Sequence, residues 1–272
     1  MALFTRSVSS GVYFICAMPL ENVYFLVFES PPDNNLSPSF LDTFASCLQT
    51  IKESYPPGVL VTASRNPHSY CRDVPSNADE QWERQAWPLL TQILTYPMPT
   101  IAFINGRAVG LGFLFALCHD FRIQSKSNST LCMCENPSTV NIAPRIDLIK
   151  AILPRSTVNF SAFANGNPLH ARESLKRGLV DKIGHVEEIF EFIKDRKLLE
   201  AARAPAYSES KMTLKREAIR VLDSIKMGRY STGRCDSKRL NAGCQAQTVS
   251  FQEAPALTPS IVVSGAHYLC LL

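Results

Sequence analysis

Apolar and polar positions alternate along the first half of the chain in a way that predicts strands followed by amphipathic helices. Two runs rich in β-branched and aromatic residues, at 11–19 and 22–29, are separated by two residues and predict an opening hairpin. A stretch dense in turn-forming residues follows at 30–38. Residues 38–53 then place apolar side chains three or four positions apart, which predicts a helix with one buried face.

The same alternation continues to about residue 126 and then gives way to mainly helical patterns. The elements expected next are strands at 58–64, 99–105 and 121–126, helices at 80–96 and 112–118, and an irregular segment at 65–79. Such strand–helix alternation predicts a largely buried α/β core. We place this core at 1–200, a C-terminal helix at 201–226, and an atypical or poorly folded tail at 227–272, where no sustained period remains.

Composition adds bounds on the class of protein. Of the 272 residues, 46% are hydrophobic and 19% are charged, which is enough apolar material for a full core. The net charge of +4, from 28 basic and 24 acidic residues, is too small to suggest a nucleic-acid-binding protein. No apolar run reaches the ~18 residues of a membrane span. We therefore expect a soluble intracellular protein.

The nine cysteines give no metal-binding pattern. Cys132 and Cys134 form a C-x-C pair, but without a second pair or a nearby histidine this is a poor zinc signal. We expect no metal site, and we interpret the cysteines as small core residues in a reducing compartment.

The segment from Pro99 to Phe121 is nearly all apolar, yet it contains Gly106, Gly110 and Gly112 within seven residues. Each glycine inside an element costs roughly 0.5–1 kcal/mol relative to alanine. One interpretation is an oxyanion hole, because bare backbone at a helix start lets a ligand oxygen approach N–H groups that have no partner within the helix. The other is close packing of a helix against a strand, which needs the same glycines.

The wider run PMPTIAFINGRAVGLGFLFALCHDFRI resembles the signature of the crotonase superfamily, the enoyl-CoA hydratases and isomerases, and is most like its fungal and plant isomerase-like branch. In that signature a strand ends in Asn-Gly, a turn rich in small residues follows, and a helix closes on an Asp, here Asp120. Weaker matches are PPDNNLSP in the early turn-rich stretch, ARESLKRGLVDKI at 171–183 and SKMTLKREA at 210–218. The resemblance covers residues from about 10 to 225.

This resemblance implies a fold, a substrate class and an assembly. The implied fold is a crotonase-like ββα superhelix with two roughly perpendicular sheets and a C-terminal helical trimerisation region, forming a homotrimer or homohexamer. The implied substrate is an acyl-CoA thioester whose oxygen is held by two backbone N–H groups while one or two carboxylates move protons. Neither a metal nor a cofactor beyond the coenzyme A thioester is implied.

Matched residue by residue, the resemblance assigns the two oxyanion N–H groups to Arg72 and Leu111. Leu111 stands where the family usually has Gly or Ala, so we expect its side chain to narrow the space beside the thioester. Cys71 replaces a family glycine; it is strained if that position needs a positive φ and unstrained otherwise. A nucleophilic Cys71 beside Arg72 is an alternative to a packing role. The other substrate contacts implied by these segments are Ser69, Tyr70, Asp73, Gly110 and Leu114.

The implied catalytic carboxylate is Glu135, 15 residues after Asp120. Apolar neighbours such as Met133 are expected to raise its pKa, which suits a group that takes and returns a proton. A surface role for Glu135 is the alternative. Hydratases of the family carry a second glutamate where this chain has Leu114, which cannot move a proton. One carboxylate suffices to shift a double bond, so the pattern favours isomerisation over hydration.

Two other functions remain open at this stage. One is an enoyl-CoA hydratase that converts 2-enoyl-CoA to 3-hydroxyacyl-CoA. The other is a catalytically impaired crotonase-fold protein that only binds acyl-CoA, which the replacements at Cys71 and Leu111 favour. The resemblance fits either fatty-acid β-oxidation or fungal secondary-metabolite or toxin biosynthesis. It points to the peroxisome, with the cytoplasm or mitochondrion as alternatives because the terminal CLL is not a Ser-Lys-Leu-type signal.

Overall fold

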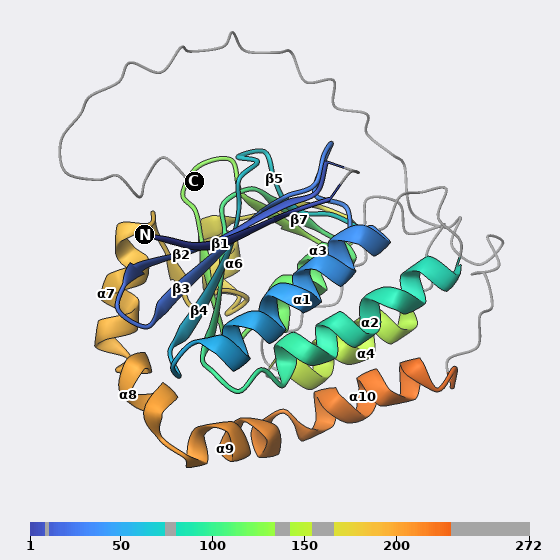
Figure 1. Cartoon of the computed structure of the whole chain (residues 1–272). Helices are drawn as coiled ribbons and strands as arrows, with labels where there is room; N and C mark the ends of the chain where they lie inside the picture. The colour runs from blue at the N-terminus through green and yellow to red at the C-terminus, as the bar shows by residue number, and fades with distance from the viewer. Residues whose placement is uncertain (9–10, 74–79, 134–141, 154–165, 230–272) are drawn as a thin grey trace, which may run out of the picture.

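The computed structural model places most of the chain in an α/β fold built from two sheets and surrounding helices (Figure 1). The residues that it describes are 1–8, 11–73, 80–133, 142–153 and 166–229.

The larger sheet has seven strands in the order β1-β2-β3-β4-β6-β8-β11. The strands are β1 Ala2–Ser7, β2 Tyr13–Leu20, β3 Val23–Glu29, β4 Val59–Ser64, β6 Thr100–Ile104, β8 Phe121–Gln124 and β11 Lys182–Ile183. The pairs β1–β2 and β2–β3 are antiparallel, and every later pair is parallel. An opening antiparallel ribbon therefore extends a parallel core.

The smaller sheet has four short strands in the order β10-β9-β7-β5. The strands are β5 Ser69–Cys71, β7 Arg107–Val109, β9 Thr130–Cys132 and β10 Leu169–His170. Strands β4, β6 and β8 of the larger sheet each continue, after a short turn, into β5, β7 and β9 of the smaller one. A helix follows each pair, so the β-β-α unit repeats along the chain as the crotonase resemblance implies.

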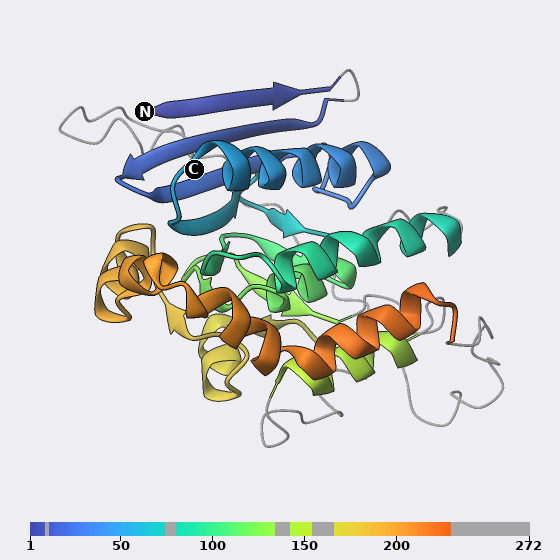
Figure 2. The same cartoon turned by 60° about the horizontal axis from the view of Figure 1, so that its bottom comes forward.

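The helices lie on both sides of the larger sheet (Figures 1 and 2). They are α1 Pro38–Ser54, α2 Glu80–Leu94, α3 Leu111–Leu117, α4 Ala143–Ile152, α6 Ala171–Lys176, α7 Glu187–Asp195, α8 Leu198–Arg203, α9 Ala206–Leu214 and α10 Arg216–Lys226. Helix α1 packs beside α2, and α10 packs against both α2 and α4.

Strand β3 shows why the central strands read as continuous apolar runs. Its residues Tyr24, Leu26 and Phe28 face the core beneath α1 and α3, whereas the alternate residues Val23, Phe25 and Val27 face α7 and α8. Successive side chains of a strand point to opposite faces, so burial on both faces removes the polar positions. The sheet is thus covered by helices on each side.

Up to β8, the sequence pattern predicted every helix and most strands but missed β1, β5 and β7. The opening hairpin, helix α1, strand β4, helix α2 and strand β6 are confirmed close to their expected bounds. Strand β5 was hidden in the segment 65–79, which we expected to be irregular, because three residues are too few to show a period. The region expected as a single C-terminal helix contains α9 and α10, which meet at Lys215.

Helix α9 is joined to the core by a buried lysine. Lys211 is 5% exposed, and its Nζ donates to the carbonyl oxygens of Tyr96 and Met98 at 2.8 and 3.2 Å and to Asp120 Oδ2 at 2.7 Å. Burial lowers the pKa of Lys211, while the Asp120 carboxylate opposes that change. All three acceptors come from segments far from α9 in the sequence, so one side chain ties the C-terminal helices to the sheet.

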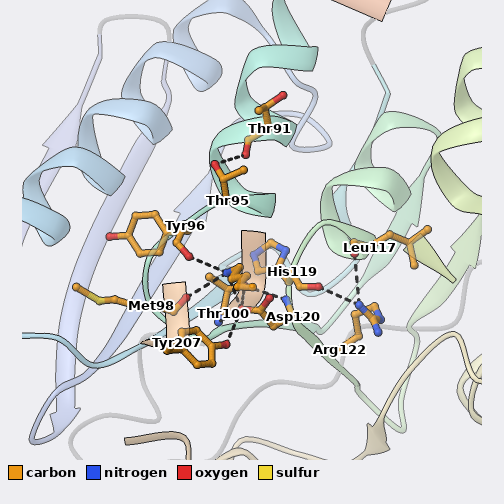
Figure 3. Close-up of polar contacts among 11 residues, drawn as sticks. Thr91, Thr95, Tyr96, Met98, Thr100, Leu117, His119, Asp120, Arg122 and Tyr207 are labelled. Carbon is orange, nitrogen blue, oxygen red and sulfur yellow. Dashed lines mark hydrogen bonds and ion pairs between the residues drawn. The ribbon is translucent and has the colours of Figure 1, made fainter. Parts of the chain in front are cut away.

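The Asp120 carboxylate is the centre of this cluster (Figure 3). Its Oδ2 also accepts the Thr100 N–H at 3.0 Å, the Thr100 hydroxyl at 3.1 Å and the Tyr207 hydroxyl at 3.2 Å. A buried carboxylate needs such donors to offset the loss of its hydration. The Asp that closes the sequence signature is therefore a structural group that binds a backbone N–H at a turn.

We predict that Lys211→Met lowers the free energy of unfolding by roughly 3–5 kcal/mol, because removal of one partner leaves a buried charge uncompensated. The matched control is Lys226→Met, whose partner Asp223 lies 3.3 Å away in a half-exposed i,i+3 pair. That change is expected to cost about 1 kcal/mol or less. Urea unfolding of both variants measures the difference, and equal costs would contradict a structural role for the buried pair.

Candidate active site

Two of the three glycines in the apolar segment, Gly106 and Gly112, lie against the main chain of β5 and the residue that follows it. A Cβ added at Gly106 would lie 2.7 Å from the amide nitrogens of Ser69 and Tyr70. A Cβ added at Gly112 would overlap the carbonyl oxygen of Cys71 and lie 2.8 Å from the Arg72 amide nitrogen. The starts of β7 and α3 therefore touch the main chain of β5 directly. The close-packing interpretation of these glycines is confirmed.

Gly110 meets a side chain instead of a main chain. It is the N-cap of α3, with φ of 60°, and a Cβ there would overlap the carboxylate of Asp73. A residue with a side chain would be strained by this backbone conformation even without the overlap. Gly110 thus permits the α3 N-terminus to sit beside the Asp73 carboxylate.

The Asp73 carboxylate is held by a buried arginine from α4. Arg145 is 1% exposed, and its two terminal nitrogens donate to the two carboxylate oxygens at 2.5 and 3.1 Å. Such a two-pronged pair fixes orientation as well as charge. It joins α4 to the end of β5 and to the start of α3. The sequence analysis missed Arg145, because nothing in its local pattern distinguishes it from a surface residue.

The two residues proposed to supply oxyanion N–H groups lie on opposite sides of this junction. Leu111 is the first residue of α3, where an amide has no acceptor inside the helix. Its side chain is fully buried in the core. Arg72 follows β5, and its amide donates to the Asn34 carbonyl oxygen at 3.2 Å. A substrate oxygen at Arg72 would therefore share or replace that bond.

Asn34 clamps the other side of β5. Its side-chain amide donates to Ser64 Oγ at 2.6 Å and to the carbonyl oxygens of Ser69 and Tyr70 at 2.8 and 3.2 Å. Its Oδ1 accepts the Ser30 N–H at 2.7 Å, so both polar atoms of this fully buried side chain are hydrogen-bonded. The early turn-rich segment, which resembled a family loop in the sequence, thus positions the strand that carries Arg72.

Cys71 is an unstrained packing residue. It lies within β5, is fully buried, and is absent from the described non-glycine residues that have a positive φ. Burial, assisted by the negative charge of Asp73, raises the pKa of the Cys71 thiol well above its usual value. A neutral, inaccessible thiol is a poor nucleophile. The structure therefore supports the packing role and not the nucleophilic one.

The remaining predicted contacts place their side chains away from solvent. Ser69 Oγ donates to the Asp33 carbonyl oxygen at 2.5 Å. Tyr70 and Leu114 are fully buried in the core. A contact between either of these two residues and a substrate would have to come from the main chain. Leu114 lies in the middle of α3, where its side chain is part of the core.

Glu135 lies outside the described residues, but the strand that leads to it does not. Strand β9 ends at Cys132, whose carbonyl oxygen accepts the Gly110 N–H at 2.9 Å. Met133, the next residue, is 2% exposed. The last described strand before Glu135 is therefore hydrogen-bonded to the N-cap of α3.

Among the residues that the structure describes, no group of three or more His, Cys, Asp or Glu side chains is arranged to hold a metal ion. Over the same residues, no helix combines the length and apolarity that a membrane crossing requires.

Solved structures share this fold. The human mitochondrial delta3-delta2-enoyl-CoA isomerase aligns with a TM-score of 0.64 at 17% identity, covering 76% of this chain and 84% of that chain. An enoyl-CoA hydratase from Bacillus halodurans gives a TM-score of 0.61 at 17% identity, covering 79% of this chain and 91% of that chain. These likenesses confirm the crotonase-like fold.

Sequence comparison gives relatives named as isomerases. Enoyl-CoA delta isomerase 3 of Arabidopsis thaliana is 31% identical over 99 residues, which cover 36% of this chain and 42% of the relative. An enoyl-CoA isomerase/hydratase of Mycosarcoma maydis is 30% identical over 129 residues, covering 41% and 47%. The chain thus matches less than half the length of these curated relatives.

A family model described as enoyl-CoA hydratase/isomerase matches residues 20–220, which is most of the chain and includes both sheets' central strands, α3 and the glycine segment. This match includes the segments in which the sequence resemblance was found. The chain belongs to the enoyl-CoA hydratase/isomerase family.

Proposed function

We propose that this protein is an enoyl-CoA isomerase that shifts a double bond in an unsaturated acyl-CoA thioester. In this proposal the thioester oxygen lies between the amides of Leu111 and Arg72, and Glu135 moves the proton. The relatives named as isomerases in Arabidopsis and Mycosarcoma support this choice within the family.

The observation that carries the proposal is the contact between Gly112 and the Cys71–Arg72 peptide. This contact joins the end of β5 to the first turn of α3. The Leu111 amide lies in that turn, between Gly110 and Gly112. Amides fixed in this way stabilise an enolate oxygen without having to reorient during the reaction. The positive end of the helix dipole adds to the same effect.

The Arg72 N–H already bonds to the Asn34 carbonyl oxygen, and in the proposed site it is shared with the substrate oxygen. At 3.2 Å its bond to the Asn34 carbonyl is longer than the usual 2.9–3.0 Å. A developing oxyanion is a stronger acceptor than a neutral carbonyl. We infer that the thioester oxygen shares this N–H as negative charge accumulates on it.

In the proposed reaction, the proton that is removed from the substrate is also returned to it. Glu135 removes a proton from the carbon next to the double bond, and the electron pair moves toward the thioester oxygen to give an enolate. The same carboxyl group then returns the proton at the far end of the former double bond. No water is consumed, so one carboxylate is enough, and the buried Leu114 agrees with the lack of a second.

Asp73 is a weaker candidate for the proton-transfer role. Both of its oxygens already accept hydrogen bonds from Arg145, and one of them lies against Gly110. A carboxylate committed to such a pair serves to hold α4 and α3 together. This leaves Glu135 as the preferred proton carrier.

There are two alternatives to the isomerase, one catalytic and one not, and the assays below distinguish them. A hydratase would add water across the double bond, and the Mycosarcoma relative is named as both isomerase and hydratase. A binding protein would hold acyl-CoA without converting it. The unstrained Cys71 removes one of the two sequence arguments for impairment.

We further propose that catalysis needs no metal or cofactor beyond the thioester itself, because the proposed chemistry uses only amides and one carboxylate. We also propose a peroxisomal location, supported by the relative named Enoyl-CoA delta isomerase 2, peroxisomal, of Arabidopsis, which is 28% identical over 102 residues. The cytoplasm and mitochondrion are the alternatives.

We predict that Glu135→Gln lowers kcat by about 10²–10⁴-fold, because loss of a general base has effects of this size. Binding of a saturated acyl-CoA, measured by calorimetry, is expected to change little. The control is Glu217→Gln, at a carboxylate that is 68% exposed on α10, which is expected to retain parental turnover. Near-full activity of Glu135→Gln on every acyl-CoA that the parent converts would overturn the assignment.

A second experiment separates isomerisation from hydration. Incubation of 3-enoyl-CoA with the protein in heavy water is expected to give 2-enoyl-CoA, identified by the ultraviolet absorbance of its conjugated thioester. Mass spectrometry is expected to find no added water and little deuterium, because the carboxyl group returns the proton that it removed. A dominant product heavier by one water would favour the hydratase, and the absence of any conversion alongside tight binding would favour the binding protein.

We predict a homotrimer or a homohexamer in solution, following the family resemblance. Light scattering on a sizing column is expected to give three or six times the chain mass of 30.2 kDa. A stable monomer with undiminished activity would contradict this assembly.

A further inference from the structure

His119 lies directly after α3 and is fully buried, beside Asp120 (Figure 3). The Asp120 carboxylate serves the C-terminal helices through Lys211, as described above. The imidazole of His119 takes part in a separate set of hydrogen bonds. Its Nδ1 lies 2.9 Å from the Phe115 carbonyl oxygen, and its Nε2 lies 2.9 Å from Thr62 Oγ1.

These contacts fix the direction of every hydrogen bond. A carbonyl oxygen can only accept, so Nδ1 carries the proton and donates to Phe115. In the neutral ring Nε2 then accepts from the Thr62 hydroxyl. Thr62 Oγ1 in turn lies 2.8 Å from the Tyr70 hydroxyl, which donates to it. The result is a one-way chain of bonds from Tyr70 through Thr62 and His119 to Phe115.

The imidazole is neutral at neutral pH. Burial lowers the pKa of His119 to about 3, although the bond to Phe115 and the nearby Asp120 carboxylate oppose this. The positive charges of Lys211 and Arg122 lower it further. Protonation of Nε2 would break the bond from Thr62, so neutrality keeps the chain intact.

This chain of hydrogen bonds ends in α3 and in β5, the two elements that form the candidate oxyanion site. Phe115 is in α3, four residues after Leu111, and Tyr70 is in β5, two residues before Arg72. The rings of Tyr70 and Phe115 also pack together, with centroids 6.0 Å apart. This chain of hydrogen bonds therefore connects α3 to β5.

We propose that His119 is a positioning residue for catalysis: through Thr62 and the Tyr70 hydroxyl it sets the position of β5 relative to α3, and so the separation of the two oxyanion amides. This rests on the proposed function for its effect on rate, but the connection itself is independent of it. Gly112 permits the main chains of α3 and β5 to touch. The hydrogen bonds through His119 then determine the position of one element relative to the other.

The test uses Tyr70→Phe and Thr62→Val, each of which removes a hydroxyl from the chain. A misplacement of catalytic groups by about 1 Å can cost 10² in rate. We expect kcat to fall by about tenfold or more in each variant, with KM within about twofold of the parent. The double variant is expected to lose little more than either single one, because both break the same connection.

The matched control is Tyr24→Phe. Tyr24 is also fully buried, and its hydroxyl donates to the Pro56 carbonyl oxygen at 2.8 Å in a part of β3 remote from Arg72. This variant also removes one tyrosine hydroxyl from a buried ring, together with its bonds to Pro56 and Asn22. It is expected to keep the parental kcat even if its melting temperature falls as far as that of Tyr70→Phe.

Two replacements of His119 test whether its hydrogen bonds, and not only its ring shape, support kcat. His119→Gln retains one donor and one acceptor, whereas His119→Phe retains the ring shape and loses both. We expect His119→Gln to retain clearly more of kcat than His119→Phe when both are assayed below their melting temperatures. Equal activity of the two variants would argue against a hydrogen-bonding role.

Backbone hydrogen exchange, followed by mass spectrometry, gives a readout that does not need an active enzyme. Peptides that contain Cys71 and Arg72 are expected to exchange faster in Tyr70→Phe and Thr62→Val than in the parent or in Tyr24→Phe. Unchanged exchange in both variants would overturn the positioning role whatever their activity. If the parent converts no acyl-CoA, the proposed function fails, and the exchange result still decides whether the chain holds β5. An unchanged kcat with faster exchange would overturn the catalytic consequence.

Discussion

The contact between main chain and main chain at Gly112 is the constraint on which the rest of this structure depends. The first turn of α3 touches the peptide that links Cys71 to Arg72, with no room for even a methyl group between them. Only glycine allows this approach, and it does so at an entropic cost that the surrounding packing must offset. The gain is a pair of main-chain segments from different β-β-α units held in one place.

Several side chains, each from a different part of the chain, hold that contact in position. Asn34 clamps β5 from the early turn, and Arg145 joins α4 to Asp73. The Tyr70–Thr62–His119 chain connects the same strand to α3. Together they surround a small junction with directional bonds. An oxyanion site requires this, because amides stabilise a developing charge only if they are already oriented.

The buried polar groups of this region are either neutral or paired. Burial lowers the pKa of His119 to about 3, so its imidazole is uncharged. The buried Lys211 and Arg145 instead face carboxylates at 2.7 and 2.5 Å. An isolated charge in the same place would cost far more than either arrangement. The core of this protein therefore carries polar connections without unpaired buried charge at these positions.

The sequence by itself determined the elements whose pattern is long enough to show a period, such as the hairpin of β2 and β3 and the helix α1. It also determined the family, because the glycine segment is a contiguous motif. It did not reveal β5, which has three residues, or the roles of Arg145 and Asn34, which have no local signal. Those roles depend on contacts between residues far apart in the chain, such as Asp73 with Arg145 or Thr62 with His119. Tertiary structure alone decided them, because hydrogen bonds depend on distance in space and a linear pattern records only distance along the chain.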